Sequence, residues 1–77
     1  MMNHSFILDM AGFLAQRLER EVGHDDRHAR VQRAFAVVFA RPPAKAERAA
    51  AVRLVEQHGL RPFCRALLNS NELIYVN

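Results

Sequence analysis

Histidines are the residues of this chain whose spacing comes closest to a metal site. His24 and His28 lie four residues apart, so on a helix they would lie on one face, as two zinc ligands do. No third ligand is obvious in the neighbouring sequence, and the glutamate-containing motif of zinc proteases is missing. His4 and His58 fall before a helix cap and at a helix end, where local hydrogen bonds account for them. We therefore predict no metal site and no cofactor.

The single cysteine, Cys64, is the candidate nucleophile. It falls on an apolar helical stripe, where a thiol is usually buried and inert, and the haem-attachment motif Cys-x-x-Cys-His is absent. The chain also lacks a Ser/His/Asp set, a convincing pair of acid and base carboxylates and a glycine-rich phosphate loop. The sequence therefore predicts no catalytic residue and no enzyme activity.

Arg41 and Glu72 are the charged residues that we expect to pair with each other. Each lies beside a helix end and next to apolar residues, and a C-terminal turn folding back over the second helix would bring them together. A bidentate, partly buried ion pair would result. The alternative, that both side chains are solvated, stays open.

The net charge of +3 and the pI near 10.0 raise the question of an anionic partner, since all but one of the 11 cations are arginines. Most of these arginines alternate with carboxylates along the chain, which favours a solvated surface with many salt bridges over a nucleic-acid face. If nucleic acid were bound, the candidate phosphate contacts would be Arg27, Arg30, Arg33 and Arg41.

Apolar residues that recur every three or four positions predict four helices that would position these groups. The first covers residues 6–22, with Ser5 as its N-cap, Asp9 in or near the first turn and Gly23 after the end. The second covers about 27–40, is capped by Asp25 or Asp26, and is ended by the prolines that follow Arg41.

The third helix begins at Pro43 or Ala44 and ends at His58, where Gly59 closes it. A fourth has Pro62 near its first turn and an apolar side that includes Leu60 and Leu68. No alternating pattern predicts a strand. We therefore predict an all-α fold, a small four-helix bundle in a single domain over residues 1–77.

The last eleven residues predict a short C-terminal docking turn. Asn69, Ser70 and Asn71 should stop the fourth helix, and Asn71 could cap a final turn through Tyr75. Residues 73–76 are too apolar for a frayed tail, so we expect them to dock on the bundle. The residues that we single out as a structural motif are Arg41, Pro43, Asn69, Asn71, Glu72 and Tyr75.

Four stretches of the chain resemble a known family. They are Asn-His-Ser-Phe-Ile-Leu at 3–8, Leu-Ala-Gln-Arg-Leu at 14–18, Arg-Pro-Pro at 41–43 with Glu47, and Ala-Leu-Leu-Asn-Ser-Asn-Glu-Leu-Ile-Tyr-Val at 66–76. Their order and spacing are similar to the C-terminal end of the planctomycete family called domain of unknown function 1553. The resemblance implies a fold and a context rather than an activity. It implies that the chain is the C-terminal piece of a larger family domain, a fragment or a stand-alone module.

Two residues depart from the family pattern. Ala44 stands where a threonine is usual, which removes a side-chain cap from the third helix, and Leu73 stands where an aromatic residue is usual. Members of the family are commonly exported, yet this sequence shows no signal peptide and no membrane-spanning segment, so the compartment stays open.

The leading functional prediction is a non-catalytic helical interaction or structural module. It would dock against the remainder of a larger family protein or against another protein. The motivation is the resemblance, the small core that 77 residues allow and the lack of catalytic groups. The alternative is a small arginine-rich domain that binds nucleic acid.

Overall fold

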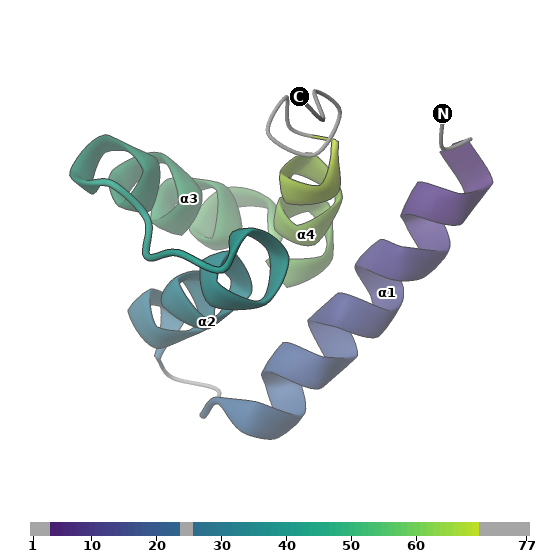
Figure 1. Ribbon diagram of the computed structural model, residues 1–77, viewed down its shortest axis with the longest axis horizontal. Coiled ribbons are helices and arrows are strands. Elements are labelled where there is room, and N and C mark those ends of the chain that lie inside the picture. The colour runs from purple at the N-terminus through teal and green to yellow at the C-terminus, as the bar shows by residue number, and fades with distance from the viewer. Residues whose placement is uncertain (1–3, 24–25, 70–77) are drawn as a thin grey trace.

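The computed structural model describes residues 4–23 and 26–69, and these form four α-helices without a strand (Figure 1). The fold is therefore all-α, a small four-helix bundle, as predicted. Figure 1 shows α1 along one side and the other three helices gathered beside it. The helices are α1 (His4–Glu21), α2 (Arg27–Phe39), α3 (Lys45–His58) and α4 (Leu60–Leu68).

The long helix α1 forms because apolar residues follow one another along one face. Ile7, Ala11, Leu14 and Leu18 are all buried on that face. The helix begins at His4, so the prediction of Ser5 as its N-cap is wrong: a residue inside a helix has helical backbone angles and cannot cap it. No acidic residue lies in the first turn, so Asp9 is too far along the chain to meet the positive end of the helix dipole.

Helix α2 has the cap that the sequence predicts. The Asp26 carboxylate accepts a hydrogen bond of 2.9 Å from the Ala29 backbone N–H. The helix ends at Phe39, and the next residue, Ala40, adopts the left-handed conformation (φ 57°) and donates its N–H to the Ala36 carbonyl at 3.1 Å. The two prolines that follow Arg41 then prevent further helix.

Helices α3 and α4 are separated by a single residue, Gly59, whose φ of 94° and ψ of 175° turn the chain sharply. This glycine closes α3 as predicted. Helix α4 ends at Leu68, and the Asn69 backbone N–H donates to the Arg65 carbonyl at 3.1 Å. The predicted cap at Asn71 and the turn through Tyr75 lie outside the described residues.

The core lies where α1, α2 and α4 meet, with α3 packed against α2 and α4. Leu18, Val31 and Cys64 are its fully buried centre, and each comes from a different helix. Helix α1 packs mainly against α4, so this pair contributes most of the contacts between α1 and the rest of the bundle. The buried residues of the cluster are Ala11, Leu14, Ala15, Leu18, Val31, Ala34, Phe35, Ala51, Phe63, Cys64 and Leu67.

Candidate functional site

The histidines do not assemble into a metal site within the described part of the chain. No three His, Cys, Asp or Glu side chains there come close enough to hold an ion. His28 is exposed on α2 and His58 is exposed at the end of α3, while His24 lies outside the described residues. Among the helices of residues 4–23 and 26–69, none is long and apolar enough to cross a membrane.

The thiol of Cys64 is buried at the centre of the core, with no exposed surface. Burial, with a smaller contribution from the negative charge of Glu19, raises its pKa to about 12. A nucleophilic cysteine needs the opposite environment, an accessible site that favours the thiolate. The side chain therefore serves as a small apolar group, as its place on the stripe predicts.

Arg41 is held between aromatic rings and a carboxylate. Its guanidinium donates to Glu47 through two parallel hydrogen bonds, Nη1 to Oε1 at 2.8 Å and Nη2 to Oε2 at 2.9 Å. The carbon of the same group lies 5.6 Å from the Phe35 ring centre and 5.5 Å from that of Phe39, within the range of cation–π attraction. This bidentate contact joins the segment after α2 to the first turn of α3.

Glu47 also begins α3. Its Oε1 accepts the Ala44 backbone N–H at 2.8 Å, which is one half of a capping box, while the Ala44 methyl group has no acceptor for the other half. The hydrogen bonds from Arg41, and then the one from Ala44, lower the pKa of Glu47 from 4.5 to about 2. The carboxylate is thus charged at neutral pH, and its oxygens already accept hydrogen bonds from Arg41 and Ala44.

Within the described residues Arg41 pairs with Glu47, six residues along the chain. The predicted partner Glu72 lies outside the described residues, so that pairing stays a prediction. Pro43 of the same motif is buried, and Asn69 ends α4 as predicted. Asn71 and Tyr75 lie outside the described residues. The contact with Glu47 had a signal in the sequence, because Arg-Pro-Pro is followed by a glutamate in the first turn of the next helix.

Three further arginines named as phosphate contacts are also engaged within the bundle. Arg27 pairs with Glu56 at 2.7 Å, and Arg33 pairs with Glu21 at 2.8 Å. Arg30 is buried, and its Nη2 donates weakly to the Val22 carbonyl at 3.4 Å. The ion pairs of Arg27 and Arg33 are of the kind that the mixed charge pattern predicts, whereas the burial of Arg30 is not.

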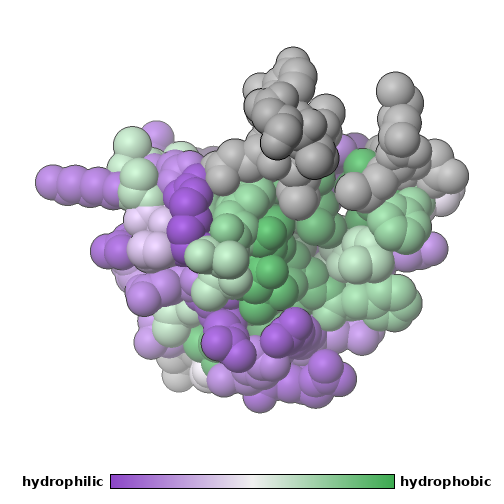
Figure 2. All heavy atoms as spheres, in the orientation of Figure 1, coloured by the Kyte–Doolittle hydropathy of each residue, from purple (hydrophilic) through white to green (hydrophobic). Residues whose placement is uncertain are grey.

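An apolar groove lies between α1, α2 and the end of α4. It has a volume of about 310 Å³. On its α1 side Phe13 is 63% exposed and Met10 is 39% exposed. Figure 2 shows apolar residues gathered over these three helices on the side that faces the viewer, with polar residues along the lower and left edges. We call this surface the α1–α2 groove; its lining residues are Met10, Phe13, Leu14, Arg17, Val37, Val38 and Leu68.

Sequence reasoning assigned α1 only one apolar face and missed this second one. The signal was present, since Phe6, Met10 and Phe13 follow one another at steps of four and three residues. All three are exposed, whereas the stripe beside them is buried. An 18-residue helix with apolar residues on two sides can bury only one of them in so small a bundle.

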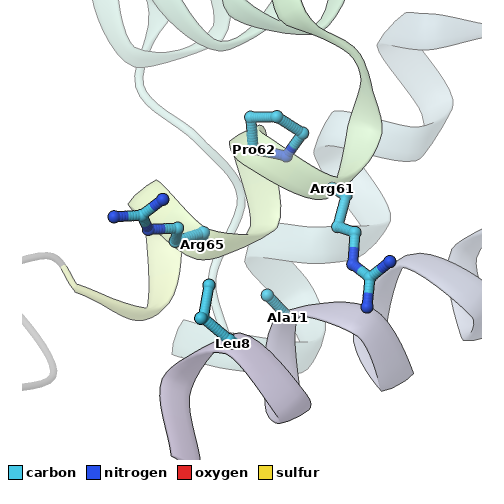
Figure 3. A pocket seen from close by; sticks show the side chains of 5 residues that line it. All are labelled: Leu8, Ala11, Arg61, Pro62 and Arg65. Atoms are coloured by element: carbon cyan, nitrogen blue, oxygen red, sulfur yellow. The ribbon is translucent and has the colours of Figure 1, made fainter. Parts of the chain in front are cut away.

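A second hollow, of about 330 Å³, lies between α1 and α4 (Figure 3). Leu8 and Ala11 of α1 and Pro62 of α4 form its apolar walls, and Arg61 and Arg65 flank it. We call it the α1–α4 hollow.

The comparisons with known proteins identify no relative: no family model, curated protein or solved structure matches the chain. The resemblance to the planctomycete family therefore stays a prediction.

Proposed function

We propose that this protein is a non-catalytic helical interaction module that docks an apolar helix of a partner protein in its α1–α2 groove. The leading candidate for that partner is the remainder of a larger protein of the planctomycete family, and a separate protein is the other. The observation that carries the proposal is Phe13, a large apolar side chain that is 63% exposed beside a groove of about 310 Å³.

The groove has the properties of a surface for a helix. Met10 and Phe13 stand on one side of it and Val37 and Val38 on the other, so an apolar ridge laid between them would contact both helices. Burial of one such side chain stabilises a complex by roughly 1.5–3 kcal/mol, and an aromatic anchor at the centre of an interface contributes most. Leu68 places the end of α4 against the same surface.

The charged groups give less support to nucleic-acid binding. Arg27, Arg33 and Arg41 each form an ion pair with a glutamate of the chain, and Arg30 is buried. A phosphate would have to displace those carboxylates before it gained the same contacts. No observation in the described residues favours this alternative over the interaction module.

The test compares the isolated protein with a double variant, Met10→Ser and Phe13→Ser. We expect the unaltered protein to self-associate with rising concentration in sedimentation runs and to bind a fluorescent apolar dye. The double variant should stay monomeric, bind no dye and keep the helix content of the unaltered protein. The matched control is Ala46→Ser with Ala49→Ser, two exposed positions on α3 that should change neither readout. A stable monomer that binds no dye, and that the double variant does not alter, would refute the proposal.

A further inference from the structure

The α1–α4 hollow carries positive charge beside apolar walls. Arg61 and Arg65 stand one turn apart on α4, and Figure 3 shows Leu8 and Ala11 of α1 between their guanidinium groups. Both arginines are exposed, whereas Ala11 is buried. An incoming group would thus meet an apolar floor and a cation at each side.

The position of Arg61 depends on a glycine. A Cβ atom on Gly12 would lie 2.8 Å from the Nη2 atom and 3.4 Å from the Cζ atom of Arg61, so the guanidinium lies against the α1 backbone where a side chain is missing. A glycine inside a helix weakens that helix. Here it gives room for a cation next to the hollow, which sets Arg61 apart from a freely moving surface arginine.

Arg61 and Arg65 belong to the arginines that have no carboxylate partner within the described residues, a group that also contains Arg20, Arg30, Arg48 and Arg53. Arg17, Arg27, Arg33 and Arg41 each pair with a glutamate at 2.7–3.0 Å. Among residues 4–23 and 26–69, no carboxylate forms an ion pair with Arg61 or Arg65. The charge of the hollow is therefore uncompensated within the described part of the chain, and apolar walls strengthen its attraction for an anion.

We propose that the α1–α4 hollow receives an acidic side chain of a partner protein segment, together with an apolar side chain one turn away. The carboxylate lies between Arg61 and Arg65, and the apolar side chain packs on Leu8 and Pro62. This inference rests on the proposed interaction function and adds the chemistry of the partner. It uses a different flank of α1, because Leu8 and Phe13 lie five residues apart and so on different sides of that helix.

A protein segment fits this surface better than nucleic acid or lipid. Nucleic acid is bound by a track of cations with aromatic side chains for the bases, and the hollow has two cations and no aromatic residue. Attraction to an anionic membrane takes a cluster of basic residues, typically four or more. A free phosphate would leave the apolar walls of Leu8, Ala11 and Pro62 without a role.

The experiment is a titration, followed by NMR, with a blocked helical peptide that carries leucine and glutamate four residues apart on one face. A second peptide has glutamine in place of glutamate. We expect the glutamate peptide to shift the backbone signals of Ala11, Gly12 and Arg65, and to bind about fivefold tighter than the glutamine peptide. Arg61→Gln with Arg65→Gln should abolish this difference. Arg48→Gln with Arg53→Gln removes the same charge from exposed positions on α3 and should preserve it.

Several results would overturn the proposal. They are equal binding of the two peptides, an equal loss in both double variants, and tighter binding of inorganic phosphate, a DNA duplex or anionic vesicles at the same signals. If the glutamine variant loses helix content, Arg61→Lys with Arg65→Lys provides a second test. This variant keeps both positive charges, so it should retain the preference for the glutamate peptide. Met10→Ser with Phe13→Ser alters the α1–α2 groove and should retain the preference for the glutamate peptide. The proposal for the α1–α4 hollow can therefore fail independently of the proposal that a partner helix docks in the α1–α2 groove.

Discussion

Replacement of Gly59 by alanine should destabilise the protein through the backbone alone. The φ of 94° and ψ of 175° place Gly59 in a region of backbone space that is essentially restricted to glycine, and a residue with a side chain held there costs about 1–3 kcal/mol. A Cβ atom on Gly59 would meet nothing within 4 Å, so no clash with a neighbour adds to the cost. The same residue closes α3 and opens α4, which leaves no adjacent loop to absorb a different conformation.

The expected change in melting temperature follows from the size of the domain. For domains of this size a loss of 1 kcal/mol lowers the melting temperature by roughly 4–8 °C, so a loss of about 2 kcal/mol predicts a fall of roughly 8–16 °C. Thermal unfolding followed by far-ultraviolet circular dichroism measures it. Gly23→Ala is the matched control, because Gly23 lacks a positive φ and an added Cβ would meet nothing within 4 Å. Equal melting temperatures for Gly59→Ala, Gly23→Ala and the unaltered protein would refute the positive-φ conformation of Gly59 between α3 and α4.

Three further predictions concern the cap of α3 and the buried thiol. Ala44→Thr should complete the capping box with Glu47 and stabilise the protein by about 1 kcal/mol, and chemical denaturation that shows no gain would contradict it. Glu47→Gln should lower the melting temperature at neutral pH. Because the folded pKa of Glu47 is depressed from 4.5 to about 2, its contribution is present above about pH 4.5 and is lost as the pH falls towards 2, so a gap to the unaltered protein that stays constant over this range would be evidence against the Arg41 contact. Cys64 has no exposed surface and burial raises its pKa to about 12, so a thiol reagent near pH 8 should react with the native protein far more slowly than with the unfolded one, and equal rates would mean that the thiol is accessible.

The helices could be predicted from the sequence because their apolar residues recur at a clear helical period. Their ends are also marked by residue types that cap or terminate helices. Asp26, Gly59 and the prolines after Arg41 act through local hydrogen bonding and backbone restriction, which do not depend on the rest of the fold. Ser5 shows the limit of this reasoning. Apolar spacing identifies the buried face of a helix better than it identifies the first residue of the helix. A residue type that is favoured at N-caps can therefore lie inside the helix, as Ser5 does.

The contact of Arg41 with Glu47 was not predicted from residue types. The apolar closing segment directed the prediction to Glu72, and that pairing lies outside the described residues and stays a prediction. The contact with Glu47 is local, and two prolines already restrict the connection between α2 and α3, so little chain entropy is lost by joining its ends. Glu47 is further fixed by the Ala44 N–H, so the ion pair and the helix cap support each other.

The way the bundle distributes its charges bears on which partner it can accept. Arginines on α1 and α2, and Arg41 after α2, are used to hold segments of the chain together through Glu21, Glu56 and Glu47. Those contacts engage four of the 11 cations, among them three of the four candidate phosphate contacts. Two of the uncovered surfaces in the described part of the chain are an apolar groove on one flank of α1 and an apolar hollow with two cations on the other. The proposed partner would therefore need apolar side chains and few acidic ones, a composition found in amphipathic helices of proteins and not in nucleic acids.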